Sequence, residues 1–221
     1  MNRLRLCVSA AAAFGLAGAS AFALNPTLIE DFETAGDLGG WGGGGGNSYT
    51  NPGTGGVGGA DDGFLMISRE FSGSLATRNF NSDYEGDYVA AGITAISLWF
   101  NDLGTPEGHM MRLSIGTTFN LWQTNLALVP GEGEWVEYII DLTDQSQFTQ
   151  IGAFGGTLED ALMTADRILI RHDTEPFDPV GAMPTPTTGD VGIDRIMFIP
   201  APGTGLVALL GAAGLCGRRR R

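Results

Sequence analysis

The sequence predicts an all-β protein, specifically an antiparallel two-sheet, jelly-roll-like sandwich with one short helix. Three observations lead to this fold class. Short apolar runs of strand length follow one another from residue 27 to residue 199, separated by polar turns. Only one segment has the pattern of a helix, and no repeat of 20 to 50 residues indicates a solenoid or a propeller. Many short strands with a single helix favour an antiparallel sandwich over a parallel α/β fold.

Nine segments have the length and composition of strands. They are 27–33, 63–68, 75–80, 93–100, 109–116, 121–128, 134–142, 166–172 and 191–199. Within 134–142, the side chains of Val136, Tyr138 and Ile140 fall on one face and those of Glu137 and Asp141 on the other. This period of two is typical of a strand with one buried face.

One segment, 157–167, is predicted to be a helix. It begins at Thr157, and Asp160 follows three residues later in the manner of a capping box. The segment 39–63 is predicted to be a mobile loop or linker, because 13 of its 25 residues are glycine and it has little apolar surface to bury. Its G-x-G-x-x-G match is trivial in a glycine run, and the chain has no lysine for a phosphate-binding P-loop.

The N-terminal 23 residues have the three parts of a secretory signal peptide. Arg3 and Arg5 precede an apolar run over 6–16, and Ala21 and Ala23 form an A-x-A cleavage site. A transmembrane helix is the alternative, but it needs about 20 apolar residues and no such site. We therefore expect export, with residues 24–199 forming one domain of ordinary size.

The C-terminal segment 200–221 combines an apolar run with a cluster of positive charge. The run over 206–216 is short compared with the roughly 20 residues of a comfortable membrane span. Four arginines follow it, namely Arg218, Arg219, Arg220 and Arg221. By the positive-inside rule they would keep this end in the cytoplasm and leave the rest of the chain on the other side of the inner membrane.

This layout resembles the PEP-CTERM sorting signal, in which a proline motif precedes an apolar helix and a basic end. Here the motif is Pro200, Ala201 and Pro202. The resemblance implies a bacterium that makes exopolysaccharide, cleavage of the tail by an exosortase, and a transient anchor in the inner membrane before release to the cell surface or outside. Ala201 departs from the pattern, since a glutamate gives the motif its name. An ordinary weak membrane anchor is the alternative.

Between the two terminal segments the chain is strongly acidic. Six arginines stand against all 25 acids there, a net charge of −19. Such a field disfavours nucleic acids and anionic lipids and suits cations such as calcium. A salt-adapted or GC-rich host would give the same composition. Both cysteines, Cys7 and Cys216, lie in the terminal segments, so the remainder has no disulfide, zinc site or thiol nucleophile.

Three short phrases resemble the laminin-B-like and carbohydrate-binding-module sandwiches of secreted bacterial proteins. They are Asp31-Phe32-Glu33, the pair Trp135 and Tyr138, and Ile193 to Ile196. This resemblance implies a structural calcium ion held by Asp31, Glu33 and Asp194, which lie on the opening and closing strands. The turn at Asp61-Asp62-Gly63 is a second candidate. The alternative is that these are separate solvated acids or turn caps.

A glycan site needs a flat aromatic ring with amides or carboxylates around it, because sugars stack their C–H faces on rings and hydrogen-bond through hydroxyls. Trp122 has Gln123 and Asn125 beside it, and Trp41 lies on the glycine-rich segment. These four residues are the candidate ligand site. A structural role is the alternative for each.

Catalysis has little support in the sequence. His109 and His172 are the only histidines, which excludes a histidine-rich metal centre, and no G-x-S-x-G nucleophile elbow is present. We therefore expect a non-enzymatic protein that binds glycan or associates with the exopolysaccharide matrix. The alternatives are a structural envelope or biofilm protein without a small ligand, and a carbohydrate-active enzyme.

Overall fold

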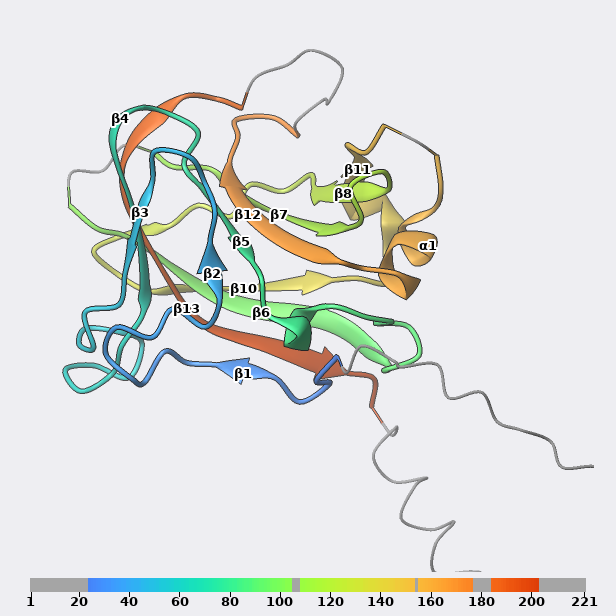
Figure 1. The fold of residues 1–221 in the computed structure, drawn as a ribbon, viewed down its shortest axis with the longest axis horizontal. Coiled ribbons are helices and arrows are strands. Elements are labelled where there is room, and N and C mark those ends of the chain that lie inside the picture. Colours follow the sequence, from blue (N-terminus) through green and yellow to red (C-terminus); the bar gives the residue numbers. More distant parts are fainter. Residues whose placement is uncertain (1–23, 105–107, 154, 177–183, 203–221) are drawn as a thin grey trace, which may run out of the picture.

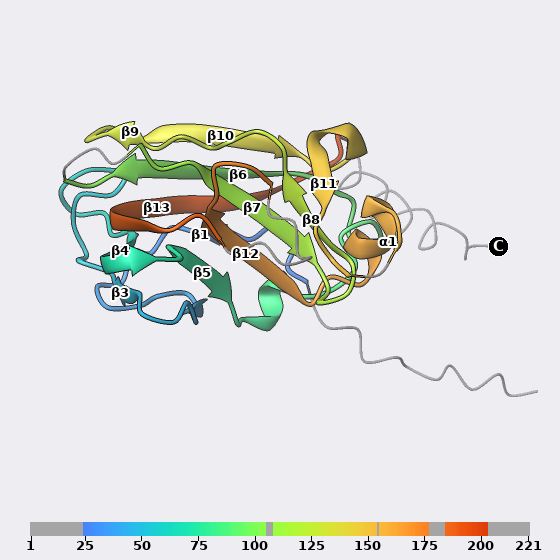
Figure 2. The ribbon, with the colours of Figure 1, turned by 90° about the horizontal axis from the view of Figure 1, so that it is seen from above.

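The computed structural model describes residues 24–104, 108–153, 155–176 and 184–202. Two β-sheets face each other across a common core, and one α-helix lies at one end of the sandwich (Figures 1 and 2). The predicted fold class, an all-β two-sheet sandwich with one short helix, is confirmed.

The larger sheet has seven strands. Its main path is β10 (Val136–Asp141), β6 (Ile93–Asp102), β13 (Thr187–Pro200), β4 (Leu65–Gly73) and β3 (Ser48–Thr50), with β1 (Ile29–Glu30) paired to β13 and β9 (Gly131–Glu132) paired to β6. Only the short β6–β9 pair is parallel. The first and last strands are neighbours, since Ile29 lies opposite Met197.

The smaller sheet has six strands and is antiparallel throughout. Its order is β11 (Phe148–Gln150), β8 (Leu121–Thr124), β7 (Met111–Gly116), β12 (Arg167–His172), β5 (Ala76–Asn79) and β2 (Trp41–Gly42). In Figure 1, β8, β7 and β12 of this sheet lie above β10 and β6 of the larger sheet, and the helix lies at their right-hand end.

The core fills the space between the sheets and follows from the alternation of side chains along each strand. Ile96, Leu98 and Phe100 of β6 and Leu113 and Ile115 of β7 belong to it, and all five side chains are fully buried. Alternate residues face the other way, as expected for a period of two.

The helix α1 (Leu158–Met163) begins with the predicted capping box. The Thr157 hydroxyl accepts a hydrogen bond from the Asp160 amide at 3.0 Å, and the Asp160 carboxylate accepts one from the Thr157 amide at 2.8 Å. The helix ends at Met163 rather than at the expected residue 167, because Arg167 already begins β12. Two 3-10 helices, η1 (Ser82–Tyr84) and η2 (Gln145–Gln147), complete the elements of the described residues.

The structure differs from the predicted strands in the glycine-rich segment. β2 and β3 lie inside 39–63, where we expected no secondary structure, and β9 and β11 were also missed. The Tyr49 hydroxyl donates to the Ala76 carbonyl at 2.7 Å, and the Asn47 amide group donates to the same carbonyl at 2.9 Å. Hydrogen bonds to β4 and β5 hold this segment against the sheets, together with the burial of Trp41 in the core.

The C-terminal boundary also differs from the prediction. Pro200 is the last residue of β13, and the Ala201 amide donates to the Gly92 carbonyl at 2.7 Å. These two residues of the predicted sorting motif therefore belong to the sandwich. The signal peptide (1–23), the apolar run 206–216 and the terminal arginines lie outside the described residues. Among the described residues, no helix is long and apolar enough to cross a membrane.

Candidate functional site

Four of the six described arginines lie on one side of the six-stranded sheet, the side turned away from the core. We call this side the arginine face and define it by Arg78, Arg112, Arg167 and Arg171. The strand register places them together. Arg112 of β7 lies opposite Arg171 of β12, and Arg167 lies on the same side of β12 because it is four residues from Arg171. Arg78 of β5 lies opposite Leu169, which is on that side of β12 as well. Within these six strands, no residue with this orientation is acidic.

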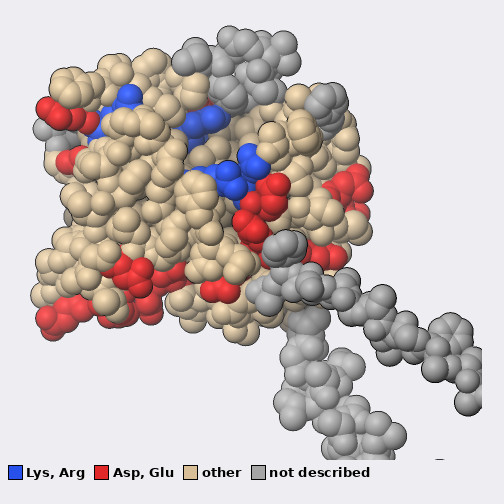
Figure 3. Space-filling view, viewed as in Figure 1, with Lys and Arg blue, Asp and Glu red and all other residues tan. Residues whose placement is uncertain are grey.

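The outward side of the seven-stranded sheet has the opposite charge. Trp99 lies opposite Glu137 on one neighbouring strand and Asp194 on the other, and Asp141 and Asp190 share that side. In Figure 3, the basic atoms lie in the upper half of the molecule, whereas acidic atoms lie along its lower edge, at its two sides and directly beside the lowest basic atoms. Within the strands, the outward-facing arginines therefore lie on one sheet and the outward-facing acids on the other. The acids that lie beside the arginines, outside the strands, are Asp166, Asp173 and Glu175.

One row of residues crosses the arginine face at right angles to the strands. From β11 to β2 it consists of Thr149, Gln123, Ser114, Leu169, Arg78 and Gly42, each opposite the next. With neighbouring strands about 4.8 Å apart, the row is about 24 Å long. We call it the outward row.

An exposed aromatic ring stands beside the Arg78 end of this row. Phe80 is 57% exposed, and its amide donates to the Gly40 carbonyl at 2.9 Å, which continues the pairing of β5 with β2. The Arg78 guanidinium carbon lies 4.9 Å from the centre of the Phe80 ring, within the range of a cation–π contact. A side chain on Gly43 would lie 2.7 Å from that ring, so the ring rests against the glycine backbone.

Open space borders the same two side chains. A Cβ on Gly42, the residue opposite Arg78, would meet no atom within 4 Å. The Nε atom of Arg78 is buried and has no hydrogen-bond acceptor among the described residues. A ring, a guanidinium and open space thus meet at one edge of the face.

The middle of the outward row is polar and buried. Ser114 is fully buried, and its hydroxyl has no hydrogen-bond partner among the described residues. Gln123 donates to an Asp173 carboxylate oxygen at 3.1 Å, and the Arg171 Nε donates to the same oxygen at 2.6 Å. Asp173 thereby neutralises Arg171 and orients Gln123.

Arg112 is the most extensively hydrogen-bonded of the four arginines on this face. Its guanidinium donates four hydrogen bonds of 2.6 to 3.0 Å, all to backbone carbonyls, which belong to Asp173, Thr174, Thr124 and Asn125. Burial lowers the pKa of Arg112, while the nearby carboxylates of Glu175 and Asp173 act in the opposite direction. The residue ties the end of β8 to the segment that follows β12.

The tryptophans nominated from the sequence do not form the site. Trp41 and Trp122 are 3% and 7% exposed and belong to the core, where Trp41 packs edge-on against Tyr84 at 5.3 Å. The prediction that they offer rings to a ligand is wrong, because strand parity turns them inward. Gln123 and Asn125 do lie on or beside the arginine face, but Asn125 is engaged with Ser146 and Thr149.

Sequence reasoning missed Phe80 and the arginines, although a signal was present. In 75–80, Ala76, Arg78 and Phe80 alternate with Leu75 and Thr77. The segments 109–116 and 166–172 alternate in the same way, with arginine on one side and Ile, Leu or Met on the other. The shared parity of arginine in three predicted strands was the usable signal.

The predicted calcium ligands are not gathered at one point. Among the described residues, no group of three His, Cys, Asp or Glu side chains could hold a metal ion. Asp31 lies near Glu30, where burial and then the carboxylates of Asp37, Asp31 and Asp83 raise the pKa of Glu30 to about 7. The prediction that Asp31, Glu33 and Asp194 hold one ion together is therefore wrong. Phe32, between the first two, has a left-handed backbone with a φ of 53°, so the chain turns there and does not continue as an extended strand.

Asp194 instead faces Asp62, from the turn that was the second candidate. Oxygen atoms of both carboxylates lie 2.8 Å from the position of a Cβ on Gly56. Asp194 accepts a hydrogen bond from the Val57 amide at 2.7 Å, and Asp62 accepts one from Gly58. Burial, with a contribution from Asp62, raises the pKa of Asp194 to about 6, while hydrogen bonds from the Val57 and Arg195 amides oppose the shift.

The two histidines are buried side by side. Their rings are 5.7 Å apart, and His109 lies between an Asp102 oxygen at 3.2 Å and the Thr188 carbonyl at 2.8 Å. His172 accepts a hydrogen bond from the Met110 amide at 2.9 Å, and burial lowers its pKa. The pair joins β6, β7, β12 and β13 inside the sandwich, away from solvent.

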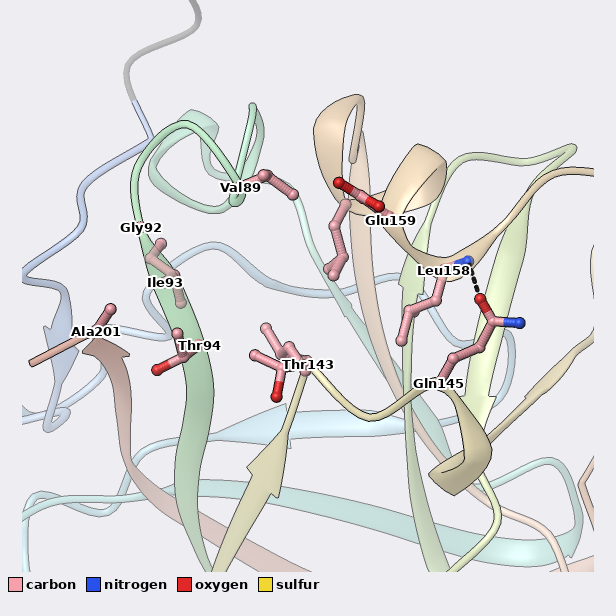
Figure 4. Close-up of a pocket in the computed structure, with 11 residues that line it drawn as sticks. Val89, Gly92, Ile93, Thr94, Thr143, Gln145, Leu158, Glu159 and Ala201 are labelled. Atoms are coloured by element: carbon pink, nitrogen blue, oxygen red, sulfur yellow. Dashed lines mark hydrogen bonds between the residues drawn. The ribbon is translucent and has the colours of Figure 1, made fainter.

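A pocket of about 480 Å³ lies at the end of the sandwich next to α1. Figure 4 shows Val89, Thr94, Thr143 and Glu159 around it, with Ala201 at the end of β13 on one side. The remaining walls are mostly aliphatic, and none of the described residues that line it is aromatic. It therefore lacks the flat ring that a sugar site requires.

Comparisons with solved structures agree on the fold. The family 11 carbohydrate-binding module from Clostridium thermocellum, solved with a β-1,3-1,4-mixed-linked tetrasaccharide, is similar with a TM-score of 0.51 and 17% identity, over 79% of this chain and 95% of that chain. A tandem pair of family 22 modules from Paenibacillus barcinonensis Xyn10C gives a TM-score of 0.50 and 15% identity, over 79% and 50%.

An exo-β-agarase is also similar, with a TM-score of 0.57 and 13% identity. The match covers 80% of this chain but 25% of the enzyme, so it concerns one part of that protein. No protein-family model matches the sequence, and no curated protein matches it. At these identities, the similarities establish a carbohydrate-binding-module-like sandwich fold.

Proposed function

We propose that this protein is an exported, non-catalytic module that binds a polysaccharide on its arginine face. The observation that carries the proposal is the exposed Phe80 ring, which stands beside Arg78 and open space at the end of a polar row. An aromatic ring with neighbouring donors is the combination that sugars require. The similarity to glycan-binding modules supports the proposal at the level of the fold.

Binding to a panel of polysaccharides tests this function. Purified full-length protein is expected to be retarded in affinity gels by at least one of mixed-linkage β-glucan, xylan, agarose and pectin. The variant Phe80→Ala should bind about tenfold more weakly, because a stacked ring contributes about 1 to 2 kcal/mol. Its melting temperature should stay within about 2 °C of the natural value, since the ring is mostly exposed.

Trp99→Ala is the matched control. Trp99 is half-buried on the outward side of the opposite sheet, so its removal should leave glycan binding unchanged. Loss of binding in Trp99→Ala together with normal binding in Phe80→Ala would place the ligand on the seven-stranded sheet and contradict the proposal. Failure of every polysaccharide to bind would favour the structural envelope or biofilm protein.

Calcium is part of the same proposal, at Asp62 and Asp194 in place of the predicted trio. The Oδ1 atom of Asp62 is buried without a partner among the described residues, and the Gly63 carbonyl approaches the position beside Gly56 where the Oδ2 atoms of Asp62 and Asp194 also meet. Calcium prefers carboxylate and carbonyl oxygens, so these groups fit it. The ion would join the glycine-rich loop to the last strand and offset the repulsion between two buried carboxylates.

The calcium proposal predicts a melting-temperature shift that depends on pH. The folded pKa of Asp194, about 6, lies above the ordinary 3.8, so without a cation its contribution to stability falls as pH rises through this range. Millimolar calcium should raise the melting temperature at pH 8 by about 5 °C, and by less at pH 5. Asp62→Asn should abolish the shift and Asp31→Asn should keep it. The opposite assignment, or no shift in the natural chain, would refute this site.

We further propose that the signal peptide directs export and that the 200–221 segment acts as a sorting signal or anchor. The hydrogen bond from Ala201 to Gly92 supports a cut beyond Pro202 rather than before Pro200, because an earlier cut would remove a residue of β13. The intact mass of the protein released by its natural host tests both ends. The expected mass is that of a chain that begins at Leu24 and ends at or shortly after Pro202. A chain found in the membrane with its C-terminal segment intact would instead support the alternative, an ordinary weak membrane anchor.

A further inference from the structure

We propose that the polysaccharide bound on the arginine face is anionic, carrying carboxylate or sulfate groups, and that Arg78 contacts these groups while Phe80 stacks on the sugar ring. This inference rests on the proposed function and goes beyond it by naming the class of ligand. It starts from the separation of charge between the two sheets described above.

The arginines of this face differ in what already neutralises them. Arg171 donates to Asp173 at 2.6 Å, and Arg167 donates to Asp166 at 2.7 Å. Arg112 is 3% exposed and directs its four hydrogen bonds to carbonyls, with the Glu175 and Asp173 carboxylates nearby. These three therefore have a local partner for their charge.

Among the described residues, Arg78 lacks such a partner. No salt bridge joins it to an acid of the described residues, its Nε has no acceptor among them, and its guanidinium lies over the uncharged Phe80 ring. Its neighbours across the sheet are Leu169 and Gly42, which carry no charge. A guanidinium in this situation gains most from an anionic ligand, because it binds carboxylate or sulfate through two parallel donors.

The positions of Phe80 and Gly42 give the ligand a place to lie. The ring rests on Gly43 with 57% of its surface exposed, and the space beyond Gly42 is open. A sugar stacked on the ring would hold a substituent within reach of Arg78. Further along the outward row, the Ser114 hydroxyl is buried without a partner among the described residues, two strands or about 10 Å from Arg78.

The net negative charge of the protein does not exclude this ligand. In about 0.1 M salt, exposed charges more than about 10 Å apart are largely screened. The acids of the seven-stranded sheet lie on the far side of the core, whereas Arg78 lies at the contact. Local charge therefore decides binding on this face, and the distant acids lower the rate of encounter at low salt.

Two pairs of polysaccharides test the inference and separate the two anions. Polygalacturonate is compared with methyl-esterified pectin, and carrageenan is compared with agarose, using the full-length protein and titration calorimetry. The natural chain should bind the charged member of at least one pair at least fivefold more tightly. The pair that shows the preference identifies carboxylate or sulfate as the recognised group.

Three variants assign the preference to Arg78. Arg78→Gln should lose about tenfold in affinity for the charged polymer and little for its neutral counterpart, since charge-assisted hydrogen bonds are the stronger ones. Arg78→Lys should recover part of the loss. Arg167→Gln is the matched control on the same face, and it should change affinity less than threefold because Asp166 already neutralises that residue.

Gly42→Val gives an independent test of the place of binding. It fills the open space beside Arg78 and should weaken both members of a pair without lowering the melting temperature. Binding of neutral and charged polymers with equal affinity, or equal loss for both in Arg78→Gln, would overturn the inference and leave the proposed glycan function intact. Failure of all four polymers to bind would overturn both.

Discussion

Replacing Arg112 by leucine is expected to lower the melting temperature by about 10 °C, the largest effect that we predict for any single substitution. The side chain donates four hydrogen bonds to carbonyls of residues 124, 125, 173 and 174, and it is 3% exposed. Leucine fills much of the volume but leaves these buried acceptors unpaired, at about 3 to 5 kcal/mol in total. For a domain of this size, 1 kcal/mol corresponds to about 2 to 4 °C.

Thermal unfolding followed by circular dichroism checks this result. The melting temperature of Arg112→Lys is expected to lie between those of the natural chain and Arg112→Leu. An ammonium group keeps the charge, but it lacks the planar set of donors with which the guanidinium reaches all four carbonyls. Arg167→Leu is the control on the same sheet, where a partly exposed ion pair contributes less than about 1 kcal/mol. A melting temperature of Arg112→Leu within about 3 °C of the natural chain would show that the carbonyls find other partners.

Asn51→Asp is expected to have the second largest effect, about 3 kcal/mol of destabilisation at neutral pH. Asn51 is buried, and its amide nitrogen lies 2.7 to 3.0 Å from the carbonyls of Phe32, Thr34 and Asp37. An aspartate has the same shape but only accepts hydrogen bonds, so it would face three carbonyls with a negative charge. The segment 32–37, which begins at the left-handed Phe32, should then lose the hydrogen bonds that hold it to Asn51.

Urea unfolding at pH 7 and pH 4 measures this effect. Protonation of the new carboxyl at the lower pH should return part of the lost stability, because a neutral carboxyl can donate one hydrogen bond. Asn125→Asp is the matched control, since Asn125 is exposed and its hydrogen bonds are open to solvent. Equal stability of the two variants would contradict an anchoring role for Asn51.

Much of the fold could be predicted because it depends on local pattern. Alternation in 134–142 gives β10, and the capping pair Thr157 and Asp160 gives the start of α1. The long apolar segment 93–100 became β6, a strand inside the larger sheet with neighbours on both sides. These signals lie within a few residues of each other, so no knowledge of distant partners is needed to interpret them.

The short strands of the glycine-rich segment could not be predicted in this way. β2 and β3 exist because β5 and β4 offer them hydrogen-bond partners, and Tyr49 reaches Ala76, 27 residues away. Glycine has weak local preferences, so the partner strand decides its conformation. The same dependence on distant residues explains why Asp194 meets Asp62 rather than Asp31 and Glu33.

The sequence by itself determined the order of the nine predicted strands and the helix, and the period-two alternation of side chains along those strands. Parity alone separates Arg78 and Phe80 from Leu75 and Thr77, but it does not say which strands are neighbours. Only the tertiary structure decided that Trp41 and Trp122 face the core and that arginines from three strands share one surface. The physical reason is that sheet register and sandwich packing join segments far apart in the chain through non-local hydrogen bonds and burial, as in the pairing of Ile29 with Met197.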